Sequence, residues 1–238
     1  MPKHVPSRLL PFAASAVLLA GAATAHAGLT GNVGVTNNYI WRGFTQTNDA
    51  PAVSGGIDYS HESGFYAGTW LSNVDFADPT SSPATRSEYE QDWYLGFGGG
   101  MDDFSYDVGY ALYTYPLSRD ANFGEVHATA GYSYVSVNVA YTVNSQVKGD
   151  SPFVEGDLYY SASLDVPIKG DFGVSATYGH YEFDKVSDSS YNHYNLYLNK
   201  GDFSFGVEAN DSDGQFPAGK KASDPRVVVS WSHSTDLL

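Results

Sequence analysis

The side chains that could do chemistry in this 238-residue chain are scattered acids and histidines rather than a catalytic cluster. They fall at alternate positions of short apolar segments, so each would point to the polar face of a β-strand. This predicted inward set is Asp58, Asp92, Asp107, Glu125, His127, Asp157, Asp165, His193, Glu208 and Arg226. Rings of Asp or Glu in a pore attract cations, so these residues are candidate pore-lining groups. The alternative is that they hydrate this face or pair with Arg42 and Arg226.

Catalytic and metal chemistry have little support in the sequence. A hydrolase needs a nucleophile, a base and an orienting group within reach, and no His stands in a local pattern that pairs it with Ser. The absence of Cys excludes thiol nucleophiles, disulfides and Cys-based metal sites. Asp211-Ser-Asp213-Gly214 resembles the middle of a calcium loop, but the twelfth position would be Lys220 instead of Glu. We therefore expect no enzyme activity, no cofactor and no metal site.

The elements that would position these side chains are strands with two different faces. Twelve segments alternate apolar with small or polar residues, as in 172–178 and 203–209, and this period of two is typical of β-strands. We predict strands at 31–41, 51–60, 64–73, 89–98, 103–114, 124–133, 136–143, 156–166, 171–182, 191–199, 202–210 and 225–234.

The connections between these strands alternate between long and short. The short ones are 61–63, 99–102, 134–135, 167–170 and 200–201, and all but Tyr134-Val135 contain typical turn residues. The long ones, near 42–50, 74–88, 115–123, 144–155, 183–190 and 211–224, are polar and acidic. Long loops at one end and short turns at the other indicate an all-β, up-and-down antiparallel transmembrane β-barrel of about 12 strands.

The N-terminal segment is predicted to be a signal peptide. Lys3 and Arg8 precede an apolar stretch, and Ala25-His26-Ala27 fits a cleavage site of the A-x-A type. We therefore divide the chain into a signal peptide at 1–27 and a single barrel domain at 28–238. Loss of Lys3 and Arg8 changes the net charge from −15 to −17, which argues against nucleic acid as a partner.

The opposite face of the predicted strands is apolar and carries no charge, as expected for a lipid-facing surface. Its predicted members are Val33, Val35, Val53, Ile57, Phe65, Leu71, Trp93, Leu95, Phe97, Phe104, Val108, Leu112, Val137, Val139, Leu158, Leu164, Phe172, Val174, Leu196, Leu198, Phe203, Phe205, Val207, Val227 and Val229. The composition agrees, because 19 Tyr and 4 Trp suit membrane–water interfaces. A soluble barrel or sandwich with one solvated face is the alternative.

The segment from residue 31 to residue 75 resembles the TorF-type putative porin family, also described as a Gcw-type conserved hypothetical protein. It begins GNVGVTNNYIWRGFTQTNDAPAV and continues through GGIDY and HESGFYAGTWLSNVD. The matching positions are Tyr39, Arg42, Gly43, Gln46, Pro51, Asp58, Tyr59, Gly64, Tyr66, Gly68 and Trp70. The resemblance implies an outer-membrane protein with a signal peptide and a pore, and it implies no enzyme.

Arg42 lies at the start of the first long loop with Tyr39, Trp41 and Phe44 around it. We predict that these residues form an interface anchor, with aromatic rings at the headgroup level and Arg42 reaching a phosphate or a loop carboxylate. The alternative is an arginine folded into the pore mouth.

These features together predict a channel of the bacterial outer membrane for passive diffusion of ions or small hydrophilic solutes, with a preference for cations. The expected partners are membrane lipid, lipopolysaccharide and the diffusing solutes. A homo-oligomer is a further possibility that the sequence leaves undecided. A non-conducting barrel that serves as an adhesin or structural anchor is the second reading, and a lipolytic or proteolytic outer-membrane enzyme is the third.

Overall fold

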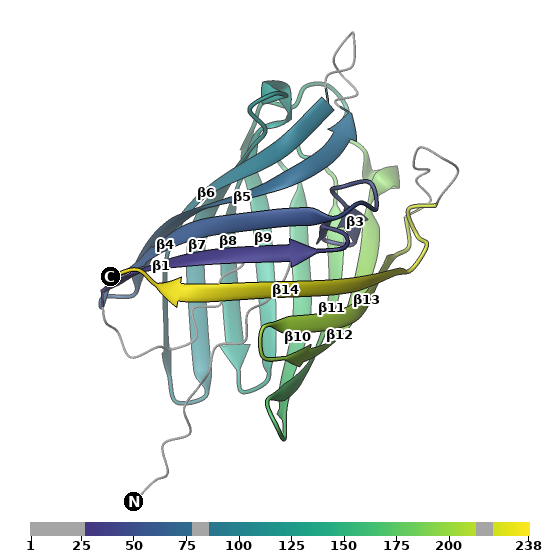
Figure 1. Cartoon of the computed structure of the whole chain (residues 1–238). Coiled ribbons are helices and arrows are strands. Elements are labelled where there is room, and N and C mark those ends of the chain that lie inside the picture. Colours follow the sequence, from purple (N-terminus) through teal and green to yellow (C-terminus); the bar gives the residue numbers. More distant parts are fainter. Residues whose placement is uncertain (1–26, 78–85, 213–220) are drawn as a thin grey trace, which may run out of the picture.

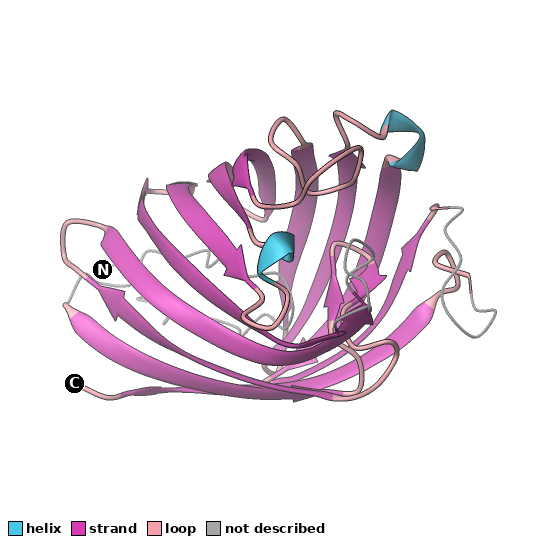
Figure 2. Ribbon diagram, turned by 90° about the horizontal axis from the view of Figure 1, so that it is seen from above, coloured by secondary structure: helices cyan, strands magenta, loops and turns pink. Residues whose placement is uncertain are grey.

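A computed structural model of the chain describes residues 27–77, 86–212 and 221–238. Residues 1–26 of the predicted signal peptide lie outside the described residues. Twelve strands form a closed antiparallel barrel in the order β1-β14-β13-β12-β11-β10-β9-β8-β7-β6-β5-β4, and β4 also pairs with β1 (Figure 1). Seen from above, the strands make a continuous curved wall (Figure 2). The predicted barrel of about 12 strands is therefore confirmed.

The barrel strands are β1 (Gly28–Thr36), β4 (Ala52–Ser60), β5 (Phe65–Ala77), β6 (Arg86–Met101), β7 (Phe104–Thr114), β8 (Phe123–Tyr132), β9 (Val135–Ser145), β10 (Leu158–Ile168), β11 (Phe172–Glu182), β12 (Tyr191–Lys200), β13 (Phe203–Asn210) and β14 (Arg226–Asp236). A separate hairpin pairs β2 (Ile40–Trp41) with β3 (Phe44–Thr45). Short 3₁₀ turns η1 (Arg119–Ala121) and η2 (Ser187–Ser189) lie in two of the long connections. Among the described residues, no helix is long and apolar enough to cross a membrane.

Several predicted boundaries are wrong: β5 continues to Ala77 instead of residue 73, and β6 covers Arg86–Met101 instead of 89–98. Two further differences have a clear physical reason. The first strand ends at Thr36 instead of residue 41, because Ile40 and Trp41 leave the wall and pair with β3. The uncertain turn near residue 134 consists of Ser133 and Tyr134, and Ser133 has a left-handed φ of 54°. Ser133 also donates its backbone N–H to the Asp103 carbonyl of the neighbouring turn, which helps to fix the connection.

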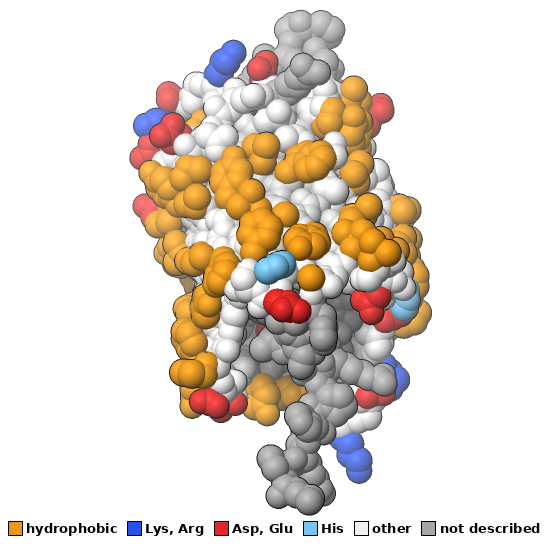
Figure 3. All heavy atoms as spheres, turned by 90° about the vertical axis from the view of Figure 1, so that its left-hand side faces the viewer, with side chains coloured by type: hydrophobic (Ala, Val, Ile, Leu, Met, Phe, Trp, Pro, Cys, Tyr) orange, Lys and Arg blue, Asp and Glu red, His pale blue; other side chains and the backbone are white. Residues whose placement is uncertain are grey.

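The outer face of the wall is apolar as predicted. Most of the predicted outward residues are exposed on the barrel, and only Leu112, Leu158, Phe172 and Val174 are half-buried. Figure 3 shows apolar side chains across the middle of one face and most charged side chains toward its two ends. The two faces of each strand thus differ in chemistry as period-two alternation requires.

Aromatic rings on the inner face lie over glycines of the neighbouring strand. Tyr94 is directly opposite Gly68, Tyr66 is opposite Gly96, and an ideal Cβ at Gly68 would come within 2.5 Å of the Tyr94 ring. Tyr197 and Gly206 repeat the arrangement between β12 and β13. Glycine is required at these positions because only a residue without a side chain lets the opposing ring lie along the wall.

A valine at position 68 should therefore destabilise the barrel. Gly68→Val would displace the Tyr94 ring, which donates a hydrogen bond to Asp58, and we expect a loss of about 1–3 kcal/mol in the free energy of unfolding. Urea unfolding in lipid vesicles measures this loss. Ala67→Val adds volume one residue away on the outer face and serves as the control, with little change expected. Equal losses in the two variants would contradict the proposed role of glycine.

Candidate functional site: the loop folded into the barrel

The connection between β1 and β4 folds into the barrel lumen instead of extending away from it. Its hairpin β2–β3 turns at Arg42 and Gly43, which both have left-handed φ angles of 47° and 84°. The hairpin is packed closely against the wall, because a Cβ at Gly43 would lie 2.6 Å from the Cβ of His193 on β12. Only glycine meets both the backbone and the space requirement here. We call residues 37–51 the inner loop.

The Arg42 guanidinium makes a bidentate ion pair with Glu125 on β8. Nη1 lies 2.8 Å from Oε1 and Nη2 lies 2.7 Å from Oε2, and both side chains are buried. The guanidinium carbon is 3.9 Å from the ring centroid of Tyr159 and 5.0 Å from that of Tyr181. Tyr181 also donates its hydroxyl to Glu125 at 2.9 Å. Such planar pairing and ring stacking suit Arg and not Lys.

The positive charge of Arg42 is stabilised by Glu125 and the tyrosine rings around it. Burial alone would lower the pKa of the guanidinium, but Glu125 raises it well above the ordinary value. The guanidinium therefore stays charged within the barrel, and the buried pair has its charges balanced and its hydrogen bonds made.

Three further contacts hold the inner loop to other strands. The Tyr39 hydroxyl donates to Glu90 on β6 at 2.8 Å, and burial together with Glu90 raises the pKa of Tyr39, which keeps it a neutral donor. Asn210 at the end of β13 donates to the Gly43 carbonyl at 2.7 Å. Asp49 and Arg226 on β14 form an ion pair at 2.6 Å. The loop thus contacts widely separated parts of the wall.

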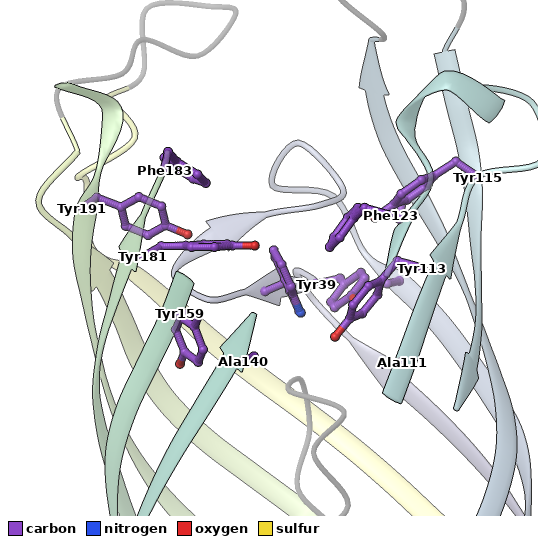
Figure 4. Packing of buried hydrophobic residues seen from close by; sticks show 13 residues of the cluster. Tyr39, Ala111, Tyr113, Tyr115, Phe123, Ala140, Tyr159, Tyr181, Phe183 and Tyr191 are labelled. Atoms are coloured by element: carbon purple, nitrogen blue, oxygen red, sulfur yellow. The ribbon is translucent and has the colours of Figure 1, made fainter. Parts of the chain in front are cut away.

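A buried aromatic cluster surrounds the inner loop. The Trp41 ring packs edge-on against Tyr113, Phe123 and Tyr181 at centroid distances of 5.6, 6.1 and 6.0 Å. Phe44 packs against Tyr191 at 4.6 Å. In Figure 4, Tyr39 lies between a group of rings on one side of the barrel and a second group on the other side. The loop and these rings together narrow the lumen.

The predicted interface anchor at Tyr39, Trp41, Arg42 and Phe44 is wrong. Tyr39, Trp41 and Arg42 are only 5%, 9% and 6% exposed, and Phe44 packs on Tyr191. The guanidinium has a carboxylate and ring faces within the lumen, so it has no need of a headgroup phosphate. The alternative of an arginine folded into the barrel describes the structure. Glu90, which sequence reasoning missed, could have been found because it alternates with Asp92 on one strand.

The predicted inward acids of β4 and β7 lie on the inner face and have hydrogen-bond partners. Asp107 is 2.8 Å from His127 Nε2 and accepts the Tyr66 hydroxyl at 3.1 Å. Asp58 accepts from Asn32 at 3.0 Å and from Tyr94. These contacts bring Asp107 and His127 together, which the sequence did not predict.

On β12, β13 and β14, the side chains of His193, Glu208 and Arg226 are also buried. Glu208 accepts the Tyr197 hydroxyl and lies opposite Arg226 in the β13–β14 register. His193 Nε2 is 3.0 Å from the Tyr159 hydroxyl and the two rings stack. Arg226 also donates to the carbonyls of Ala222 and Asp224, so it holds the segment of the chain that leads into β14.

The remaining predicted acids differ in setting. Asp92 is 2% exposed, and its Oδ1 has no hydrogen-bond partner among the described residues. Asp165 is half-buried near the short-turn end of β10. Asp157 lies one residue before β10 and accepts the backbone N–H groups of Val154 and Asp184 at 3.1 and 2.8 Å. Asp157 therefore organises two long loops, which argues against its predicted place along a strand of the lumen.

No group of three or more His, Asp or Glu side chains within the described ranges could hold a metal ion. The resemblance of residues 211–222 to a calcium loop falls largely on residues 213–220, which lie outside those ranges.

Solved structures of two porins are similar to the chain. The KdgM porin matches with a TM-score of 0.53 and 10% identity over 87% of this chain and 99% of the porin. The NanC porin matches with a TM-score of 0.50 and 10% identity over 88% of this chain and 100% of the porin. These identities are low, so the similarity shows a shared fold. No curated protein matches the sequence.

The sequence pattern of one bacterial family covers nearly the whole chain. The match spans residues 20–233 and includes the inner loop, the barrel wall and the strands that close it. It confirms the Gcw-type resemblance, while the TorF-type porin name stays a prediction. The chain belongs to the bacterial protein family of unknown function Gcw_chp.

Proposed function

We propose that this protein is a passive outer-membrane channel for ions or small hydrophilic solutes and that it prefers cations. The observation that carries the proposal is the division of the closed barrel into an apolar outer face and a charged inner face. A bilayer admits sheets only as closed barrels, because every backbone group must find a partner within the wall. The alternating long and short connections support the same placement, with the long loops outside the cell. Two structural neighbours are porins and share this fold.

The preference for cations is supported by the balance of charge within the lumen. Glu90, Asp92 and Asp107 are buried on the β6–β7 side, where Glu125 on β8 has Arg42 as its counter-charge. Carboxylates that line a pore lower the energy of a passing cation and raise that of an anion. Diffusion needs no energy source, and weak binding lets a solute leave the channel.

A non-conducting barrel is the second candidate, because the inner loop and its aromatic cluster occupy part of the lumen. Such a barrel would serve as an adhesin or structural anchor. Liposome swelling separates the two candidates: a channel admits small sugars and the vesicles swell, while a closed barrel leaves them unchanged.

Neutralising two lumen acids should weaken the preference for cations. In the Asp107→Asn, Glu208→Gln double variant, the reversal potential in a KCl gradient should move toward zero, because two attracting charges are lost. The matched control is Asp202→Asn, Asp236→Asn, which removes two acids from the short-turn end of the barrel. A reversal potential that is unchanged in the lumen variant would contradict the proposal that these acids cause the preference for cations.

A lysine in the middle of the outer face should destabilise the protein if that face contacts lipid. Val139 is 47% exposed on β9, and Val139→Lys should cost about 2–4 kcal/mol near the bilayer midplane. Val135→Lys places the same side chain at the end of the same strand, where the cost should fall to about 0–1 kcal/mol. Unfolding in lipid vesicles measures both, and equal costs would contradict the placement.

A further inference from the structure

The inner loop crosses the barrel from one side to the other. It leaves the wall at β1 and returns at β4, which are neighbours. Its Arg42 reaches Glu125 on β8 and the Tyr159 ring on β10, and each of these strands stands five strands away from β1 around the barrel. The ion pair therefore connects opposite sides of the lumen.

The Arg42–Glu125 pair is the contact whose loss would most favour release of the inner loop. Both groups are buried, so removal of either one leaves the other as a desolvated charge without a counter-charge. A lone Glu125 carboxylate would gain most by contact with water, which requires that the loop and the rings above it move aside. The contact of Tyr39 with Glu90 lacks this bidentate charge pairing.

We propose that the Arg42–Glu125 pair is a latch that fixes the inner loop across the lumen and thereby determines the conductance and size limit of the channel. The constriction part rests on the proposed channel function, whereas the latch part concerns the loop alone. The pair acts as a positioning and specificity-determining pair, and the Tyr159 and Tyr181 rings pack against the guanidinium. Loss of the pair releases the loop and widens the path.

The latch can be tested without any assumption about transport. The chain contains no Cys, so a single engineered thiol is a clean reporter. Ala140 is 2% exposed, lies on the inner face of β9 and belongs to the aromatic cluster around the loop. In Ala140→Cys protein refolded into vesicles, a membrane-impermeant maleimide should react slowly.

Adding Arg42→Ala to the reporter should raise the labelling rate by about tenfold or more, since one charge of a buried pair is left without its partner. Adding Glu125→Gln, which nearly preserves volume, should also raise it. Lys200→Gln removes one positive charge at a short turn, where Lys200 donates to the Gly170 carbonyl, and should leave labelling unchanged. A heat-dependent shift in gel mobility checks that each variant is folded.

Methylguanidinium should rescue the released loop only while Glu125 is present. Added to the Arg42→Ala reporter, this ion can refill the site between the carboxylate and the two tyrosine rings and slow the labelling again. It should have no effect on the reporter that carries both Arg42→Ala and Glu125→Gln. Rescue that is equal in the two backgrounds, or labelling that Arg42→Ala leaves slow, would overturn the latch.

Single-channel recording then tests the constriction. The Arg42→Ala channel should show larger current steps than the parent channel, and methylguanidinium should reduce them. Faster labelling with steps of unchanged size would overturn the constriction while the channel function stands. Faster labelling with no steps from either protein would overturn the constriction together with the proposed function.

Discussion

The whole structure depends on closure of the backbone hydrogen-bond ladder between β1 and β14. Seven residue pairs, from Thr30↔Asp236 to Thr36↔Ser230, join the first and last strands and remove both free edges of the sheet. Closure fixes which face of each strand is inside. Val33 and Val35 consequently face outward, while Asn32 and Thr36 face the lumen. The chemistry of both faces follows from this single constraint.

A closed wall creates an interior in which charges need partners. The lumen holds carboxylates from several strands, and burial of each one is costly unless a donor is near. Tyrosine hydroxyls supply many of these donors, as Tyr181 does for Glu125 and Tyr66 does for Asp107. Some of these rings also lie over glycines of the neighbouring strand, as Tyr66 does at Gly96. Tyrosine side chains thus both line the inner wall and donate hydrogen bonds to its carboxylates.

The strands could be predicted because their signal is local. Period-two alternation in segments such as 203–209 depends on neighbouring residues only, and all twelve barrel strands appear near their predicted positions. The inward direction of Asp107 and Glu208 follows from the same alternation. Strand ends were less predictable, as at Thr36, where departure of the chain into the lumen depends on distant contacts.

The path of the inner loop could not be predicted for the same physical reason. Arg42 and Glu125 are 83 residues apart in sequence, and no local pattern says that they meet. An arginine among Tyr39, Trp41 and Phe44 has the composition of an interface anchor, and only the three-dimensional structure shows that its partners lie within the barrel. The pairing of Asp107 with His127 was hidden in the same way, although both were placed on the inner face.

We propose that this barrel provides an aqueous path past the folded inner loop. Planar-bilayer recording of the native, refolded protein tests it most directly, with folding verified on the same sample. We expect discrete current steps that are small for a 12-stranded barrel, because the loop and its aromatic cluster narrow the lumen. A folded barrel that inserts into the bilayer and gives no current steps would contradict the proposed channel function.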